Sequence, residues 1–246
     1  MVYTNIDHSI PFQAHSSSEY WLVNLRLVPT AVRLGNPSAG TEFSAIRTAL
    51  VEMAREGCAA FVDVPTMMPH FDGKAGAAAS AKRTFLKPIN CCPSLHTAAP
   101  LFAYNAGSNH FPEKRELLRR RVADVVSTVI RAKFHAIIDV SFGIFLAQKA
   151  TERIGLDFDD LESYFTRCQK ARDQVPYEEV YRVYREIRDL SKVRDCQKSG
   201  TSELMRRYFQ EVGLPRVVRQ QSNCYFDLES KALVYAPELK VGKGLI

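Results

Sequence analysis

The chain has 246 residues, of which 46% are hydrophobic and 24% are charged, and its formal net charge is +6. These values are typical of a globular protein, so they argue against wholesale disorder and leave room for one large domain or one domain with an appendage. The charge is modest and no nucleic-acid-binding module accompanies it, so nucleic acid is not an expected partner.

The sequence also lacks the marks of a secreted or membrane-embedded protein. Residues Met1–Trp21 contain neither the basic region nor the apolar core of a signal peptide. The most apolar window, Ala136–Ala147, includes an aspartate and is shorter than the roughly 20 residues that span a bilayer. The cysteines show no C-x-x-C spacing, which favours reduced thiols. We therefore expect a cytoplasmic, water-soluble protein without integral membrane insertion.

Helical patterns dominate the first part of the chain. Ser16 and Glu19 have the spacing of a capping box and open a helical pattern that Pro29 is expected to kink or split. A second helix is predicted over Thr41–Gly57, with a threonine cap, an apolar stripe and a closing glycine. The prolines and glycines that follow, up to Asn90, predict an irregular crossover.

The helical pattern continues after the crossover. Ser94 is expected to cap a helix that runs to about Asn105. Pro112–Ala150 is predicted to be a long helical region that is broken near its middle. Three further amphipathic helices are expected within residues 157–173, 176–195 and 200–213.

The tail from residue 214 onward has a β-leaning pattern, which suits a hairpin or an extended segment. The chain as a whole is therefore predicted to be all-α, a bundle of about seven or eight helices. We expect residues 1–150 to form the helical core that carries the pocket. Residues 151–246 should form a helical extension and tail packed on that core, and the pattern leaves open whether they cover the pocket or mediate a homodimer.

Two surface patterns allow both a structural and a functional interpretation. The basic run Glu113–Arg121 is either a solvated helix face or a rim that attracts an anionic substrate or a membrane surface. Tyr177, Tyr181 and Tyr184 recur at helical spacing and form either a packing stripe or a wall for the substrate.

His135 and Asp139 are four residues apart, so on a helix they would lie on the same face. Arg131 and Ser127 would extend this polar stripe by one and two turns. A carboxylate beside an imidazole fixes its tautomer and stabilises its cation, which leaves the other ring nitrogen as nucleophile or base. The pair is also compatible with a buried histidine that simply has its hydrogen-bonding partner.

A second polar motif precedes this pair in the chain. Pro93-Ser94-Leu95-His96, followed by His135-Ala-Ile-Ile-Asp139-Val140-Ser-Phe-Gly143, resembles the type 2 phosphatidic acid phosphatase (PAP2) superfamily, which includes the vanadium haloperoxidases. The segment Ile6–Phe12 is also similar to the stretch that precedes the first helix in several of these families. The resemblance covers roughly residues 5–150 and implies a helical bundle of the phosphatase/haloperoxidase type.

The resemblance implies a role for each of these polar residues. His135 would be the nucleophile that forms a phosphohistidine, Asp139 would orient it, and His96 would be the general acid for the leaving oxygen. Ser94 and the amides at its helix N-terminus would bind the phosphate oxygens. This chemistry needs no cofactor and no metal.

The sequence departs from the superfamily where cations are expected. The lysine and arginine of the first motif, K-x6-R-P, are replaced at best by Asp63 and His70, which become additional pocket candidates. His70 is also compatible with a surface loop. The arginine that normally precedes the second histidine is absent, so Arg131 or Lys133 would have to supply the phosphate-binding charge.

Two enzymatic functions follow from these residues. The first is a phosphatase- or diphosphatase-like phosphoric-ester hydrolase, acting on an anionic small molecule or a prenyl diphosphate. The alternative is the same fold repurposed as a lyase, cyclase or metal-dependent biosynthetic enzyme. In that case His70, His96, His135 and Asp139 would ligate a divalent metal or act as acid–base groups. A helical binding protein without chemistry is the third interpretation.

Overall fold

The computed structural model describes residues 40–64, 92–131, 134–168, 175–193, 200–211, 224–227 and 232–235. Three sequence-based predictions lie outside these residues: the helix expected after Ser16, the crossover that contains His70, and the contribution of Lys133.

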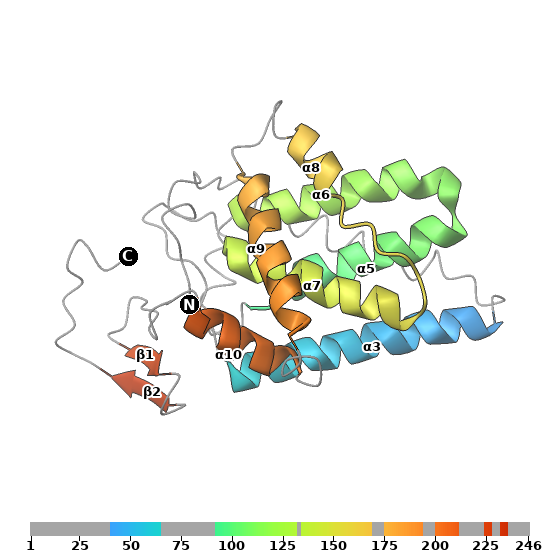
Figure 1. Cartoon of the computed structure of the whole chain (residues 1–246). Helices are drawn as coiled ribbons and strands as arrows, with labels where there is room; N and C mark the ends of the chain where they lie inside the picture. The colour runs from blue at the N-terminus through green and yellow to red at the C-terminus, as the bar shows by residue number, and fades with distance from the viewer. Residues whose placement is uncertain are drawn as a thin grey trace, which may run out of the picture.

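Helices build the body of the described chain, so the predicted all-α class is confirmed there (Figure 1). The short 3-10 helix η1 (Pro112–Lys114) joins two of the longer helices, and an antiparallel hairpin pairs β1 (Cys224–Asp227) with β2 (Ala232–Tyr235). The seven described α-helices are α3 (Gly40–Asp63), α5 (Leu95–His110), α6 (Arg115–Arg131), α7 (Ile137–Arg153), α8 (Glu162–Cys168), α9 (Tyr177–Ser191) and α10 (Thr201–Glu211).

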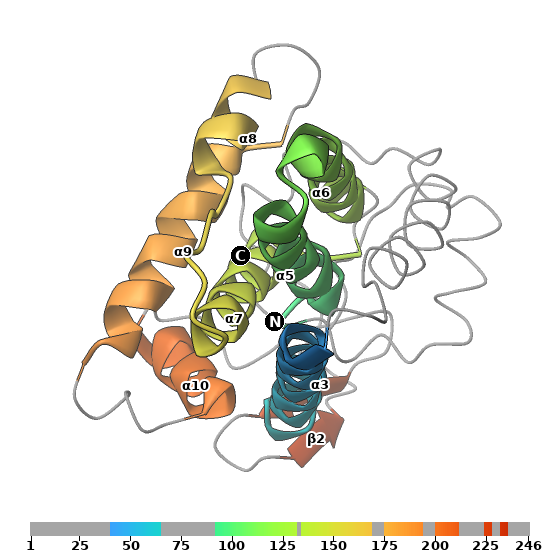
Figure 2. The same ribbon diagram turned by 90° about the vertical axis from the view of Figure 1, so that its right-hand side faces the viewer.

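α7 lies at the centre of this body (Figure 2). A helix that is apolar on all sides needs neighbours on all sides, and α7 has them: α3, α5 and α6 pack on one side of it and α9 on the other. Its almost fully buried side chains include Ile137, Val140, Phe142, Ile144 and Leu146.

The prediction that Gly57 ends the second helix is wrong, because α3 continues to Asp63. Gly57 is buried inside the helix, and a Cβ on it would lie 2.6 Å from Cδ2 of Leu95. The glycine therefore serves the close passage of α3 beside α5. A glycine that lets two helices pack closely cannot be distinguished from a glycine that ends a helix by the local sequence pattern alone.

The predicted break in the Pro112–Ala150 region is confirmed, since α6 ends at Arg131 and α7 begins at Ile137. The prediction that Arg131, His135 and Asp139 share one helical face is wrong. His135 lies in the connection between the two helices, and Asp139 lies in the first turn of α7. The helix begins here because the Asp139 side chain accepts the backbone N–H of Ala136, as a capping carboxylate does.

The C-terminal helices share their hydrophobic core with the earlier ones. The hydroxyl of Ser141 on α7 donates to the Val180 carbonyl of α9 at 2.8 Å. The ring of Phe142 meets those of Tyr208 and Phe209 of α10 edge-on, with centroids 5.7 and 6.0 Å away. α9 and α10 therefore both pack against α7. The tyrosines of α9 form the packing stripe: Tyr177, Tyr181 and Tyr184 are each 1% exposed.

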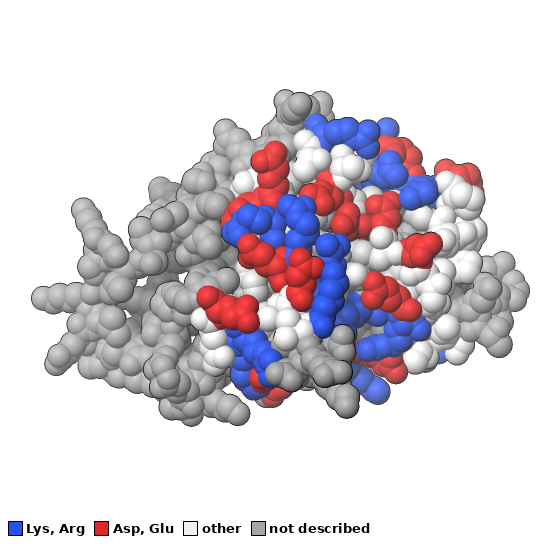
Figure 3. All heavy atoms as spheres, in the orientation of Figure 1, with Lys and Arg blue, Asp and Glu red and all other residues white. Residues whose placement is uncertain are grey.

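Acidic and basic side chains are interspersed on the face shown in Figure 3. The basic run on α6 follows the same arrangement. Arg119 and Arg120 pair with Glu116 of their own helix at 3.2 and 3.0 Å, and Arg115 pairs with Asp159 at 3.0 Å. Three arginines of this run are thus paired with carboxylates, which favours the solvated helix face of its two interpretations.

Candidate active site

α5 begins at a serine cap. Oγ of Ser94 accepts hydrogen bonds from the backbone N–H of Thr97 at 3.2 Å and from its hydroxyl at 3.1 Å. The cap satisfies one of the amides that a helix N-terminus leaves without an intrahelical partner. The predicted cap is confirmed, and it places His96 in the first turn of α5.

His135 is held between the end of one helix and the start of the next. Its N–H and that of Phe134 donate to the Val129 carbonyl of α6, at 3.2 and 3.0 Å. The next residue, Ala136, is the N-cap of α7, and its N–H donates to Oδ2 of Asp139 at 2.9 Å. The backbone at His135 is consequently held from both directions, and the residue is only 5% exposed.

The starts of α5 and α7 meet through the backbone. The N–H of Ser94 donates to the Asp139 carbonyl at 2.8 Å, and both residues are completely buried. His96 follows Ser94 by two residues, and His135 precedes Asp139 by four. This one hydrogen bond therefore joins the two motifs that the sequence keeps far apart.

The three titratable side chains form a chain of contacts, which we call the Asp139–His135–His96 relay. Oδ2 of Asp139 lies 3.5 Å from Nδ1 of His135, and Nε2 of His135 lies 3.0 Å from Nδ1 of His96. The two imidazole centroids are 5.3 Å apart, with the rings tilted by 48°. The relay runs from a fully buried carboxyl through a nearly buried imidazole to a partly exposed one.

Burial raises the pKa of the Asp139 carboxyl to about 7, although hydrogen bonds from the Ala136 amide and the Cys92 side chain oppose this rise. A charged carboxylate is costly in an apolar interior, so a proton on it becomes competitive near neutral pH. The buried end of the relay is therefore a carboxyl that gains and loses a proton near neutral pH.

The other predicted site residues are placed as follows. Ser94 is buried and serves the helix cap. Arg131, at the end of α6, directs its guanidinium to the carbonyl and hydroxyl of Ser127, both at 3.4 Å. Asp63 is an exposed residue at the end of α3, and its carbonyl accepts a hydrogen bond from Arg206 at 3.3 Å.

Of the predicted site residues, the structure therefore brings His96, His135 and Asp139 together. His70 and Lys133 lie outside the described residues.

A metal ion would find few ligands in this arrangement. Among the residues that the structure describes, no group of three or more His, Cys, Asp or Glu side chains is arranged to hold one. His96 and His135 direct nitrogens toward each other, but Asp139 contacts the opposite nitrogen of His135. The described side chains thus supply two convergent nitrogens, fewer than the three protein ligands of a typical catalytic zinc site.

Two residues outside the predicted set contribute to the site. Cys92 is fully buried, and its side chain hydrogen-bonds Asp139. Gly143 contacts the first turn of α5. Cys92 directly precedes the first motif and Gly143 ends the second, so their position in the chain was the available signal. The contacts themselves depend on how α5 and α7 pack.

Comparisons with known proteins leave the family open: no protein-family model, no curated protein and no solved structure matches this chain. Within the part of the chain that the structure describes, none of the helices combines the length and the apolar character needed to cross a bilayer.

Proposed function

We propose that this protein is a phosphoric-ester hydrolase that transfers a phosphoryl group to His135 and then to water. A phosphate monoester or a prenyl diphosphate is the expected substrate class. The observation that carries the proposal is the Asp139–His135–His96 relay, because it joins an oriented, nearly buried imidazole to a second imidazole at hydrogen-bond distance.

The position of Asp139 favours one nitrogen of His135 as the nucleophile. Oδ2 of Asp139 lies 3.5 Å from Nδ1, longer than a typical hydrogen bond, and the charge of the carboxylate at that distance favours a proton on Nδ1 and a lone pair on Nε2. In this tautomer Nε2 accepts a hydrogen bond from Nδ1–H of His96, 3.0 Å away. The proposed starting state thus has a bare nitrogen on the nucleophile and a proton on Nδ1 of the acid.

The first step breaks the bond between phosphorus and the leaving oxygen. His96 withdraws from Nε2 of His135, since phosphorus has to come within about 3–3.5 Å of that nitrogen. Nε2 attacks, and the leaving oxygen takes the Nδ1 proton of His96, which enters this step as an imidazolium and becomes neutral. The phosphorylated His135 ring is positive, and the Asp139 carboxylate stabilises it.

The second step returns both histidines to their starting states. Water attacks phosphorus while neutral His96 removes one of its protons through Nδ1. The bond between phosphorus and Nε2 breaks, inorganic phosphate leaves, and His96 is again an imidazolium. Protons and charges balance over the cycle without a further reactant.

The substrate phosphate belongs at the first turn of α5, next to His96. The positive end of a helix dipole favours an anion at this position. Arg131 is the basic side chain proposed to move in and complete the charge of the pocket, because guanidinium binds phosphate oxygens in pairs.

A second candidate function is proton transfer on a substrate that lacks phosphate, as in a lyase or cyclase. The direct contact between the two imidazoles favours it, because Nε2 of His135 is already engaged and His96 is the more exposed end of the relay. In this case His96 would act as base or acid and His135 would only pass protons to it.

Phosphate release separates these candidates. The full chain is incubated with p-nitrophenyl phosphate and with a prenyl diphosphate, with and without EDTA. The hydrolase proposal predicts release that EDTA does not change and that His135→Ala lowers by at least about 10³-fold. His110→Ala is the matched control, because His110 is an exposed histidine at the other end of α5. Release that requires a metal, or that survives His135→Ala, contradicts the proposal.

A further inference from the structure

α7 comes unusually close to the first turn of α5 at Gly143. A Cβ on this glycine would lie 2.6 Å from the backbone oxygen of Ser94 and 3.0 Å from Cβ of Thr97. Contacts below 3 Å are essentially absent for real Cβ atoms. The nearest atom is a backbone oxygen in a capped helix start, so it has no side-chain rotation with which to yield.

The contact between Gly143 and Ser94 joins the two helix starts that position the relay. Gly143 follows Asp139 by one helical turn, so both face α5 from the same side of α7. The Ser94 residue that Gly143 touches also donates its N–H to the Asp139 carbonyl. His96 lies two residues further along α5, so the spacing of α5 and α7 at this point sets how far His96 stands from His135.

We propose that Gly143 is a positioning residue: by lacking a side chain, it sets the α5–α7 spacing that brings Nδ1 of His96 to Nε2 of His135. The claim concerns the imidazole pair itself, and only its consequence for turnover rests on the proposed function.

A methyl group at this position would move α5 and α7 apart far enough to weaken the hydrogen bond between the two imidazoles. Relieving a 2.6 Å contact requires a shift on the order of half an ångström, and catalytic groups need to be held within about that tolerance. The imidazole nitrogens start at 3.0 Å, and hydrogen bonds weaken steeply beyond about 3.2–3.5 Å.

Gly57 offers a matched control for the same substitution. Its added Cβ would also meet an atom at 2.6 Å, but that atom is Cδ2 of Leu95, the end of a partly buried, rotatable side chain. Both glycines are buried in helices, and alanine favours a helix over glycine by about 1 kcal/mol at either position. Gly57→Ala therefore adds the same methyl without pushing on the α5 backbone.

The experiment detects the hydrogen bond between the imidazoles directly. The full chain is labelled with 15N-histidine, and the scalar coupling between Nδ1 of His96 and Nε2 of His135 is measured by NMR. We expect the coupling in the native chain and in Gly57→Ala, and its loss in Gly143→Ala. Persistence of the coupling in folded Gly143→Ala, or its absence from the native chain, would overturn the proposal.

A second pair of variants covers the case in which Gly143→Ala fails to fold. Thr97 is fully buried at the same contact, and Thr97→Ile and Thr97→Val both lose the hydroxyl that donates to Ser94, so the pair differs only in the carbon that isoleucine adds between α5 and α7. The coupling should be lost in Thr97→Ile and kept in Thr97→Val; coupling kept in both overturns the proposal.

Turnover gives a separate readout that depends on the proposed function. If phosphate release is detected in the native chain, Gly143→Ala should lower kcat by roughly 10²-fold and Gly57→Ala should leave it within about twofold. Loss of the NMR coupling in Gly143→Ala with no phosphate release from any variant supports the positioning role and contradicts only the hydrolase.

Discussion

Nδ1 of His96 lies 3.0 Å from Nε2 of His135, although 39 positions separate the two residues in the chain. Neither residue reaches the other by helical periodicity. His96 is placed by the serine cap of α5, and His135 by the connection that precedes α7. The contact between the two imidazoles therefore results from how the N-terminal ends of α5 and α7 pack. It should depend on the residues at which these two helices touch.

Asp139→Asn tests the orienting role of the carboxyl. Asparagine keeps an oxygen for the Ala136 N–H, so the start of α7 should be preserved. Its neutral amide has no charge with which to favour a proton on Nδ1 of His135 or to stabilise the phosphorylated ring, so the reacting tautomer is no longer favoured. We expect kcat for phosphate release to fall by roughly 10²–10⁴-fold with little change in KM. Unchanged kcat in the folded variant would remove Asp139 from the mechanism.

The same substitution should change how stability depends on pH. Burial raises the pKa of Asp139 from 3.8 to about 7, so the folded state holds a proton that the unfolded state releases. This stabilisation is fully present below about pH 4 and is lost as the pH rises toward 7, at up to about 1.4 kcal/mol per pH unit. Asparagine does not titrate. Urea denaturation at pH 5 and pH 8 should show Asp139→Asn gaining stability relative to the native chain at the higher pH; an equal difference at both would contradict the burial argument.

Glu56 should contribute more to stability than its neighbour Glu52. Glu56 is 19% exposed and hydrogen-bonds Lys149 of α7 and Thr201 of α10, and it lies 3.7 Å from Arg153. Desolvation alone would raise its pKa, but these partners outweigh it and hold the pKa below the ordinary value. The stabilisation is present above about pH 4.5 and is lost as the pH falls through the lowered pKa.

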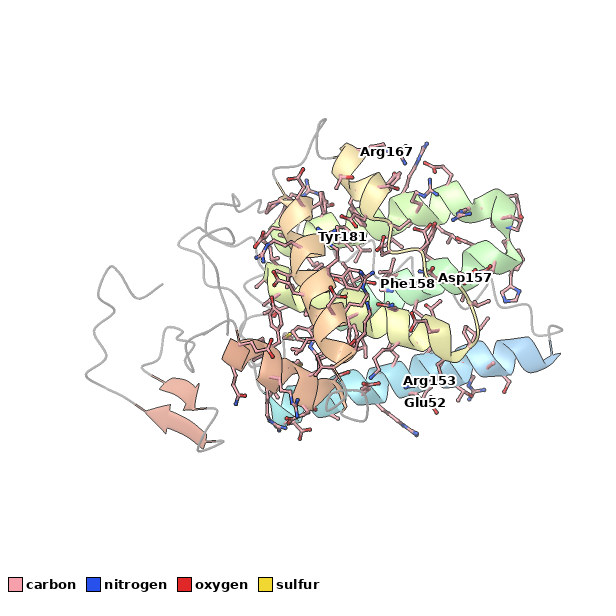
Figure 4. All side chains as sticks on the ribbon, in the orientation of Figure 1. Glu52, Arg153, Asp157, Phe158, Arg167 and Tyr181 are labelled. Carbon is pink, nitrogen blue, oxygen red and sulfur yellow. The ribbon has the colours of Figure 1, made fainter. Side chains whose placement is uncertain are left out.

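We expect Glu56→Ala to lower the free energy of unfolding by about 1–3 kcal/mol at pH 7, because the buried Thr201 hydroxyl and the partly buried Lys149 ammonium lose their acceptor. Glu52 pairs with Arg153 at 2.8 Å, both labelled in Figure 4, but its side chain is 44% exposed. Glu52→Ala should therefore change stability by less than about 1 kcal/mol. Equal losses from both substitutions would contradict the assignment of Glu56 as the residue that joins α3, α7 and α10.

The C-terminal helices should be necessary for folding of the core. α9 packs Val180, Tyr181 and Ile187 against its neighbours, and the structure gives them at most 1% exposure. A chain that ends at Arg153 would expose the face of α7 that they cover, and we expect it to aggregate or to lack a cooperative thermal transition. A chain that ends at Glu211 keeps every described helix and serves as the control. A cooperative, folded chain ending at Arg153 would show that the extension is dispensable.

Most of the described helices could be predicted from the sequence because they carry strong signals. The amphipathic patterns of α9 and α10 and the serine cap of α5 correspond to helices in the structure. The errors have a common origin. At Gly57 and at Asp139, one residue type serves two purposes, and the choice between them depends on a neighbour that the local pattern does not contain.

The candidate site was only partly predictable. His96, His135 and Asp139 could be grouped from their motifs, and the structure brings them together. A break near the middle of Pro112–Ala150 could be predicted, but not that it separates Arg131 from His135, because the apolar pattern is almost the same wherever the break falls. Gly143 lay inside the quoted motif, but its contact with Ser94 depends on the packing of two helices.

Trapping the covalent intermediate tests the central claim most directly. His96→Ala is mixed with p-nitrophenyl phosphate, quenched in base, and mapped by mass spectrometry. The leaving p-nitrophenolate needs no acid, whereas attack of water needs the base that this variant lacks, so a phosphoryl group should accumulate on His135. Phosphohistidine at His135, absent from His96→Ala/His135→Ala, is the predicted result. Release of p-nitrophenol with no phosphoryl group on His135, or with the group on another residue, would contradict the account.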